Sequence, residues 1–363
     1  MSAAITPRLL KESDYASWTQ LVSQSAEGSP YHLPEYLDSL CRATGGRFKL
    51  LVAERNGEML GGVPLYEEQS RWGRFVAPRL LLYYNGFVLK PYTGKYPSEC
   101  AGLRIKILTA LEEQLSKETY GRLRLKSRAM FSDARVFVAR GWLARPTYTY
   151  VVRITDLPAA WNLVEPNLRR LIQRAEREGV TVTQDDDFDS FHRMHLETHQ
   201  RKGAPLYLPE KAFRNFFEGL AKQGVLRLYH ARLKDGQSIS SQLVLLGPHS
   251  TSHTISAAAD AKHLGLGGTP FLRWKVFESL AKLGYLANDL TDAELNPVTH
   301  FKSQLGGDLE TCLVVSRQDS AVFRSGEALV RLLHRARNGA VAAARRAAPR
   351  KAQLSPPGQE PTP

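Results

Sequence analysis

The stretch 262–277, Lys-His-Leu-Gly-Leu-Gly-Gly-Thr-Pro-Phe-Leu-Arg-Trp-Lys-Val-Phe, decides how the rest of the chain is interpreted. It follows a run at 226–258 that is typical of β-strands, and it passes through three glycines into a segment with helical spacing. Thr269 is the predicted N-cap residue of this helix, and Pro270 fits its first turn. A strand that runs through glycines into a capped helix directs several backbone N–H groups to one point, where the helix dipole favours an anion.

The residues of this turn are therefore candidate ligands for a phosphate group. We expect Gly265, Gly267, Gly268 and Thr269 to hold the anion through their backbone N–H groups. Glycine-rich turns are equally common where nothing binds, because glycine also serves tight turns and close packing. A purely structural turn is therefore the alternative, and the surrounding sequence has to decide between the two.

Composition places the chain among ordinary globular proteins. Its 363 residues suit two domains better than one, and its 43% hydrophobic and 23% charged residues are typical of such proteins. The three cysteines are far apart and odd in number, which indicates reduced thiols and not a disulfide framework or a zinc site. Since the sequence has neither a membrane-spanning run nor a secretion-signal pattern, we expect a cytoplasmic protein.

The net charge of +13 predicts an anionic partner, such as a phosphorylated substrate, a nucleic acid or a membrane surface. Part of this charge lies at 319–363, which is predicted to be a basic helix followed by a Pro-rich disordered tail. The simpler interpretation of this segment is a docked helix with a solvated end. The alternative is an anchor that binds a nucleic acid or makes peripheral contact with the inner face of the membrane.

Secondary-structure signals repeat in the two halves of the chain. In the first half, strands flank a hairpin turn at Asn56-Gly57, and a strand at 80–89, a helix, a strand, a helix and a strand follow. In the second half, Asp235-Gly236 takes the place of that turn and the same order follows. The repeat predicts an α/β protein with a mixed sheet, built from two copies of one unit at 1–150 and 151–318.

The second copy resembles the GNAT acyltransferase fold. GNAT proteins hold the pyrophosphate of acyl-CoA on a Gln/Arg-x-x-Gly-x-Gly/Ala loop, and the same place here reads Lys-His-Leu-Gly-Leu-Gly at 262–267. Lys262 stands where the family has Arg or Gln, so a hydrogen-bond donor is kept. The first copy has Lys-Pro-Tyr-Thr-Gly-Lys-Tyr-Pro at 90–97 in this place. Since its two prolines leave fewer N–H groups, we expect this copy to form a wall of the substrate cleft, with Tyr84 and Tyr92 facing it.

With its two tandem copies, the chain resembles a narrower group within this superfamily, the Fem-type transferases. These carry two GNAT-like domains and add amino acids from aminoacyl-tRNA to peptidoglycan precursors. The likeness rests on the stretches 167–180, 197–203 and 288–307. It implies an N-acyltransferase with acyl-CoA or aminoacyl-tRNA as donor and an amine on an anionic cell-envelope precursor, peptidoglycan or polysaccharide, as acceptor.

The resemblance also implies roles for three basic residues. Lys302, which follows Phe301, matches a lysine that relatives carry near the reaction centre. It would act electrostatically at the transferring carbonyl. Arg201 and Lys202 match positions that meet substrate phosphate in relatives. Each of these residues could instead be an ordinary solvated cation.

Acidic residues and further arginines near these motifs are additional candidates. Asp289 and Asp292, at the end of a predicted strand, could orient the amine or act as a base, or they could cap the next helix. Relatives often have a Gly-Gly pair where this chain has Thr291-Asp292. Arg170 and Arg174 could line the same cleft, or they could simply form a solvated face.

Other site types receive less support from the sequence. His192, His195 and His199 share one helical face, but they lack the His-Glu-x-x-His order and no Cys or carboxylate cluster completes the set, so we expect no metal. Two other functions stay open. One is an inactive GNAT-like pair that serves as a binding module. The other is a basic RNA-binding protein, although an RNA-binding signature with interleaved aromatic residues is missing.

Overall fold

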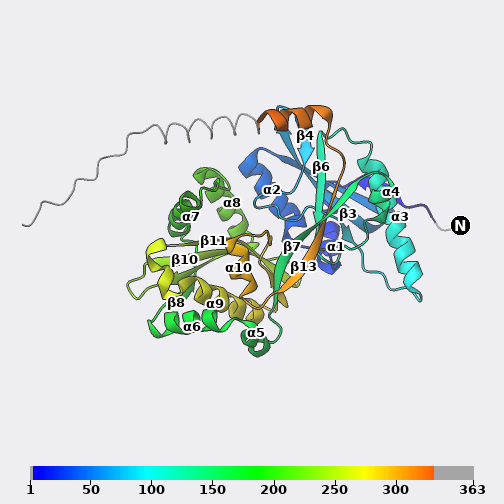
Figure 1. The fold of residues 1–363 in the computed structure, drawn as a ribbon. Helices are drawn as coiled ribbons and strands as arrows, with labels where there is room; N and C mark the ends of the chain where they lie inside the picture. The colour runs from blue at the N-terminus through cyan, green and yellow to red at the C-terminus, as the bar shows by residue number, and fades with distance from the viewer. Residues whose placement is uncertain (1–2, 331–363) are drawn as a thin grey trace, which may run out of the picture. The chain divides into compact units, whose positions relative to one another are not determined.

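A mixed sheet of 13 strands forms the centre of residues 1–318, which make up one structural unit of the protein (Figure 1). The computed structural model describes residues 3–330, and the described part of the second unit, which starts at Asp319, is helical over 321–330. The predicted Pro-rich tail lies outside the described residues. Within 3–330, no helix has the length and apolar character needed to cross a membrane.

The first half of the chain has helices followed by an antiparallel meander, as predicted. Asn56 and Gly57, with φ angles of 54° and 79°, join β2 to β3, as the Asn-Gly signal requires. The strand β1 and the short strand β4 were not predicted. The elements are β1 (Thr6–Leu9), α1 (Tyr15–Gln24), α2 (Pro34–Thr44), β2 (Arg47–Arg55), β3 (Glu58–Ser70), β4 (Gly73–Val76), β5 (Val88–Leu89), α3 (Pro97–Leu115), β6 (Arg122–Ser127), α4 (Arg135–Ala139) and β7 (Leu143–Arg153).

The second half follows the same order after a longer helical start. Its elements are α5 (Leu157–Leu163), α6 (Pro166–Arg177), β8 (Thr181–Gln184), α7 (Phe188–Lys202), α8 (Glu210–Lys222), β9 (Leu226–Arg232), β10 (Ser238–Leu245), β11 (Thr251–Ala259), α9 (Gly268–Lys282), β12 (Ala287–Asp289), α10 (Pro297–Ser303) and β13 (Asp308–Ser316). In each half one parallel pair interrupts the antiparallel pattern, β4 with β6 and β11 with β12. The predicted α/β class with a mixed sheet is confirmed.

The two halves share strands at the middle of the sheet. The strand order is β1-β2-β3-β4-β6-β13-β7-β12-β11-β10-β9-β8, with β5 paired to β3 beside this path. The last strand, β13, lies between β6 and β7 of the first half, and β7 pairs on its other side with β12. Because β7 crosses residue 150 and pairs with two strands of the second half, the division into 1–150 and 151–318 stays a prediction.

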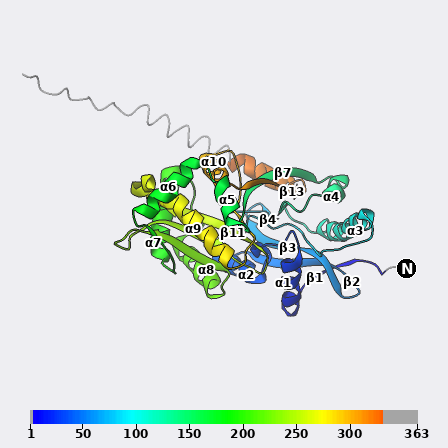
Figure 2. The same cartoon turned by 90° about the horizontal axis from the view of Figure 1, so that it is seen from below.

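Helices cover both faces of the sheet. Alternate residues of β2 point to opposite sides, so Val52 joins a core with α1, α2, α7 and α8, whereas Leu51 joins a core with α3 and α4. The first core spans the two halves, since Tyr36 on α2 packs edge-on against Phe216 on α8 at 5.7 Å between ring centroids. A third core lies under α6 and α9. Figure 2 shows α1 and α3 on opposite sides of the first-half strands.

The strand predicted at 80–89 is wrong over most of its length. Only Val88 and Leu89 form a strand, β5, and the preceding residues run as irregular chain with one isolated bridge from Leu82 to Arg79. Leu81 has a φ angle of 70°, and the hydroxyl of Tyr36 donates to its carbonyl oxygen. The residues 81–89 are buried without an alternating pattern, and without a period the sequence cannot distinguish a strand from a buried loop.

Candidate functional site

The glycine turn joins β11 to α9 through a 3-10 helix at Ala261–Leu266. The N-cap residue of α9 is Gly267, with a φ angle of 83°, so the predicted N-cap at Thr269 is wrong by two residues. A left-handed residue at this point turns the chain into the helix, and glycine adopts that conformation without strain. The Thr269 hydroxyl instead lies 3.3 Å from Oγ of Ser240 on β10.

Packing explains two of the three glycines. A Cβ atom on Gly267 would lie 2.4 Å from the carbonyl oxygen of Leu171 on α6, and one on Gly268 would lie 2.8 Å from Cδ1 of Ile239 on β10. A Cβ atom on Gly265 would meet no described atom within 4 Å. The structural alternative therefore accounts for Gly267 and Gly268. Gly265 has open space beside it and stays the best candidate for an anion contact.

Lys262 begins this turn with an exposed side chain. Its backbone N–H donates to the carboxylate of Asp260 at 2.9 Å, and the ring of His263 lies 3.3 Å from the same carboxylate. The first N–H group of the turn is thus already occupied by an acid. An anion held here would contact the N–H groups that follow.

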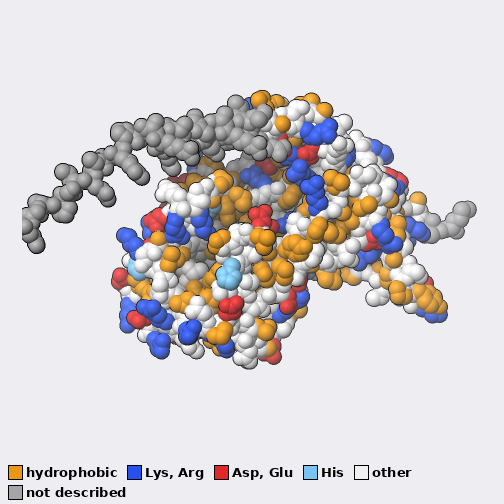
Figure 3. All heavy atoms as spheres, viewed as in Figure 1, with side chains coloured by type: hydrophobic (Ala, Val, Ile, Leu, Met, Phe, Trp, Pro, Cys, Tyr) orange, Lys and Arg blue, Asp and Glu red, His pale blue; other side chains and the backbone are white. Residues whose placement is uncertain are grey.

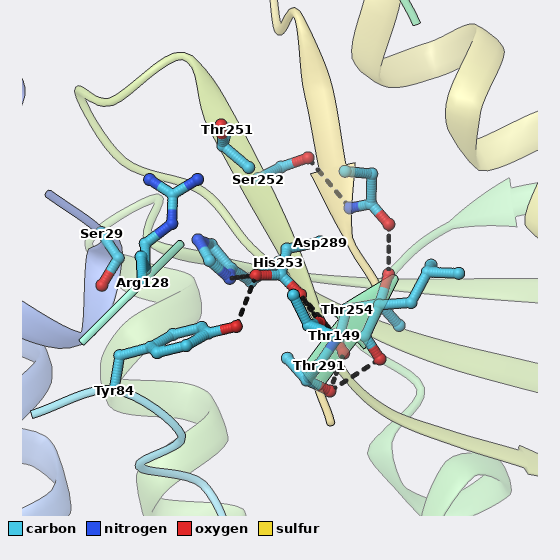
Figure 4. Close-up of polar contacts among 12 residues, drawn as sticks. Ser29, Tyr84, Arg128, Thr149, Thr251, Ser252, His253, Thr254, Asp289 and Thr291 are labelled. Atoms are coloured by element: carbon cyan, nitrogen blue, oxygen red, sulfur yellow. Dashed lines mark hydrogen bonds and ion pairs between the residues drawn. The ribbon is translucent and has the colours of Figure 1, made fainter. Parts of the chain in front are cut away.

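Asp289, at the end of β12, is a fully buried carboxylate that joins the two halves of the chain (Figure 4). Its oxygens accept hydrogen bonds from the Tyr84 hydroxyl at 2.8 Å, the Thr149 hydroxyl at 2.5 Å and the Thr291 backbone N–H at 2.7 Å. His253 Nδ1 lies 3.5 Å from it, and burial lowers the pKa of His253 well below its usual range. Three donors around one carboxylate fix its orientation.

Two consecutive residues after this strand adopt a left-handed backbone. Thr291 and Asp292 have φ angles of 52° and 50°, a conformation that costs non-glycine residues energy. This conformation gives a physical reason for the Gly-Gly pair that relatives often carry here. The surroundings hold the turn in place, since the Thr291 hydroxyl donates to the Thr254 carbonyl at 2.9 Å.

Lys302 on α10 reaches this turn with its ammonium group. Nζ donates to the carbonyl oxygens of Thr291 and Asp292, the second at 2.8 Å. Burial and the nearby Arg273 lower the pKa of Lys302 to about 8, against the attraction of the Asp292 and Asp289 carboxylates. At neutral pH the lysine is therefore mostly a cation, held by two carbonyls beside the end of β12.

The side chain of Asp292 points to a different partner. Its carboxylate lies 2.7 Å from Nζ of Lys126, a residue of β6 whose side chain is only 6% exposed. The Lys126 ammonium also lies 5.5 Å from the centre of the Tyr84 ring. The structure thus brings the three predicted catalytic residues, Lys302, Asp289 and Asp292, to one place. It gives Asp289 a buried position and Asp292 a half-exposed one.

The predicted basic substrate ligands lie on two helix surfaces. Arg170 and Arg174 are exposed on α6, the helix that packs against the glycine turn. Arg201 and Lys202 are exposed at the end of α7, where Gly203 ends the helix with a φ angle of 60°. All four are accessible to a ligand.

The two predicted tyrosines do not share a site. Tyr84 is fully buried and its hydroxyl is engaged by Asp289. Tyr92 is 49% exposed and lines a cavity of ≈ 520 Å³ in the first half, together with Arg104 and the buried Glu27. This cavity lies next to the loop that replaces the glycine turn in the first half. Only Tyr92 is thus available to a ligand from solvent.

Three residues of the site were missed by sequence reasoning. His253 and Lys126 lie on strands and reach Asp289 and Asp292 only through the tertiary fold. Arg273 lies on α9 among apolar positions and is itself buried. A charged residue on the inward face of a predicted helix was the one available signal for it.

A metal site receives little support. Within 3–330, three side chains that could bind a metal lie close together, those of Asp185, Asp187 and His230. The guanidinium of Arg232 already lies 3.1 Å from the first carboxylate and 2.9 Å from the second. A bound cation would have to compete with this arginine, so we assign no metal here.

Comparisons with known proteins give the fold a family context. Residues 165–303 match the model of the acetyltransferase (GNAT) domain family. FemX is similar in structure with a TM-score of 0.67 at 12% identity, over 85% of this chain and 96% of that one. The C-terminal domain of a putative lysylphosphatidylglycerol synthetase from Agrobacterium fabrum gives 0.55 at 12% identity, over 88% and 96%. A tandem GNAT protein from the clavulanic acid biosynthesis pathway gives 0.52 at 13%, over 87% and 98%.

These findings settle the fold. The predicted arrangement of two tandem GNAT-like domains is confirmed, and so is the resemblance to Fem-type GNAT acyltransferases, as a shared fold. No curated protein sequence matches the chain. The matched segment, 165–303, contains the glycine turn, Asp289, Asp292 and Lys302.

Proposed function

Starting from a GNAT acetyltransferase domain within a chain that shares its fold with FemX, we propose that the protein is an N-acyltransferase. It transfers an acyl or aminoacyl group to an amine on a cell-envelope precursor. One observation carries this proposal: the cationic Lys302 is held by two carbonyls of a strained turn directly after the buried Asp289. Such a fixed cation is suited to stabilising negative charge on a carbonyl oxygen during acyl transfer.

The described residues fit different parts of this reaction. Lys302 stabilises the developing oxyanion, because its position is fixed before the reaction begins. Asp289 is a positioning residue, since its oxygens are engaged by Tyr84, Thr149 and the turn that holds the lysine. Asp292, half-exposed and paired with Lys126, is the better candidate to orient the attacking amine or take up its proton.

The donor is acyl-CoA or an aminoacyl-tRNA, and both carry phosphate. The N–H groups at Gly265 and the start of α9 are the proposed phosphate contacts. Lys262, Arg170 and Arg174 stand on or beside this turn and would add positive charge. Arg201 and Lys202 are the proposed contacts of an anionic acceptor. The lysylphosphatidylglycerol synthetase among the similar structures favours an aminoacyl donor and a membrane-lipid or wall-precursor acceptor.

Contact with tRNA or with the membrane surface is part of the proposal and is supported mainly by the charge of the chain. The +13 net charge supports either partner, and the basic segment proposed as the membrane contact lies largely beyond residue 330, outside the described part. On the face shown in Figure 3, Lys and Arg side chains are scattered among acidic and hydrophobic ones and do not form one patch. This face therefore gives no support for a dedicated RNA-binding protein.

A transfer assay tests the proposal. The purified protein is incubated separately with acetyl-CoA and with charged tRNA, each with a panel of amine acceptors that includes a peptidoglycan precursor and phosphatidylglycerol vesicles. Mass spectrometry then follows the acceptor. We expect a mass gain of one acyl or aminoacyl group that depends on the protein. A protein that binds one of the donors but never modifies an acceptor would be the inactive binding module instead.

A further inference from the structure

Arg273, in the middle of α9, carries a guanidinium group in an unusual position. Its side chain lies inside the protein, with the residue 7% exposed, and Nη1 is buried without a hydrogen-bond partner among the described residues. Arginine has five N–H donors, and a buried guanidinium is normally paired with a carboxylate or several carbonyl oxygens. Leaving such a group unpaired is costly, so an unpaired buried arginine needs an explanation.

The charges around Arg273 do not neutralise it. Burial lowers the pKa of Arg273 to about 10, and the only nearby group that raises it is the phenol of Tyr207. Lys302 is a cation close enough for Arg273 to lower its pKa. The two carboxylates in the region have other partners. Asp292 pairs with Lys126 at 2.7 Å, and Asp289 accepts from Tyr84, Thr149 and Thr291.

Hydroxyl groups complete this environment. Tyr207, in the loop between α7 and α8, is close enough to Ser256 and Tyr83 for their hydroxyls to affect its pKa, although burial raises that pKa more strongly. Oγ of Ser256 on β11 is buried, and apart from the nearby Tyr207 hydroxyl it has no hydrogen-bond partner among the described residues. Arg273 and Lys302 therefore lie near hydroxyl groups, and the two carboxylates of this region are engaged elsewhere.

We propose that Arg273 and Lys302, with Ser256 and Tyr207, form a buried subsite for an anionic group, a carboxylate or a phosphate, carried by a substrate. The subsite is separate from the glycine turn, because Arg273 lies five residues beyond Gly268, about 7.5 Å along the helix axis. Its role in positioning a substrate for transfer rests on the proposed function. The anion would supply the missing partner of Arg273 and would hold the substrate beside Lys302.

The proposal makes an unusual prediction for stability. If the partner of Arg273 is a ligand, its unpaired buried charge destabilises the unliganded protein. Arg273→Met should then unfold at a temperature equal to or higher than that of the wild type. A structural arginine would give the opposite result, since its replacement would break contacts within the protein. Arg273→Lys keeps a charge at this place, although not the planar fork that binds an anion through two bonds.

The test follows thermal unfolding of the full chain in sodium chloride, sodium acetate and sodium phosphate at one ionic strength. Because phosphate also stabilises proteins in general, the signal is the difference between variants. Arg177→Met, which removes an exposed arginine on α6, is the matched control. We expect acetate or phosphate to raise the melting temperature of the wild type and the control in a saturable way. Arg273→Met should lose this shift and Arg273→Lys should keep part of it.

Each result decides the question. A shift with only one of the salts identifies the anion as carboxylate or phosphate. A shift of equal size in Arg273→Met, no saturable shift in the wild type, or an Arg273→Met protein that is less stable than wild type in chloride would each overturn the subsite. The assay uses neither acyl donor nor acceptor, so its outcome is independent of whether the transfer assay succeeds.

Discussion

The glycine turn allows a prediction that separates packing from ligand binding. Replacing Gly267 with alanine adds a Cβ atom 2.4 Å from the Leu171 carbonyl oxygen, a backbone atom of α6 that cannot move without shifting the helix. The residue also has a φ angle of 83°. A Cβ atom in the left-handed region costs roughly 1–2 kcal/mol, and overpacking adds about 1–3 kcal/mol. We therefore expect Gly267→Ala to lower the free energy of unfolding by about 2–5 kcal/mol.

Urea unfolding followed by circular dichroism measures this loss, with Gly265→Ala as the control. A Cβ atom on Gly265 meets open space, so this variant should stay within about 0.5 kcal/mol of wild type. Gly265→Asp should be equally stable but should weaken donor binding, because its carboxylate would repel phosphate. Gly267→Asp would not test the anion site cleanly, because its Cβ atom would meet the same Leu171 carbonyl oxygen. Wild-type stability of Gly267→Ala would refute the packing argument.

Three further predictions concern buried polar groups. Tyr84→Phe removes one donor from the buried Asp289 carboxylate and should cost about 1–3 kcal/mol in urea unfolding, and an unchanged midpoint would contradict the network. In the folded protein the pKa of Lys302 is lowered from 10.5 to about 8. Between pH 8 and 10.5 the unfolded chain therefore binds more protons than the folded one, and the free energy of unfolding should rise with pH more steeply in the wild type than in Lys302→Met. Parallel pH profiles for the two proteins would contradict this assignment. The pKa of His195 is lowered to about 3 by burial and by His199 and His192, so stability should fall as the pH drops from 6.5 toward 3. His195→Phe should flatten that profile, and an equally steep decline would count against the buried neutral histidine.

Local signals in the sequence were sufficient for most elements. Turn chemistry at Asn56-Gly57 and the apolar spacing of the helices identified them within a few residues. The glycine turn was placed correctly between strand and helix, but the choice between Gly267 and Thr269 as N-cap depended on the close approach of α6. A contact between segments about a hundred residues apart leaves no local pattern, so this detail required the structure.

The candidate site was predicted in part for the same reason. Lys302, Asp289 and Asp292 were named from a motif, and they lie together in the structure. The left-handed turn at Thr291 and Asp292 has no glycine to reveal it. The hydrogen bond from Tyr84 to Asp289 joins residues 205 positions apart. The position of β13 between β6 and β7 likewise depends on pairing between the two halves. Such long-range pairings follow from the assembled sheet and from no single segment.

The turnover of Lys302 variants tests the central claim most directly. Each variant is assayed with the same donor and acceptor as the wild type, at a temperature where circular dichroism shows it folded, because the lysine also holds two carbonyls of the turn. We predict that Lys302→Met lowers turnover roughly a hundredfold, or about 3 kcal/mol, while donor affinity stays close to wild type, and that Lys302→Arg recovers only part of the loss. A folded Lys302→Met protein with wild-type turnover would contradict the account.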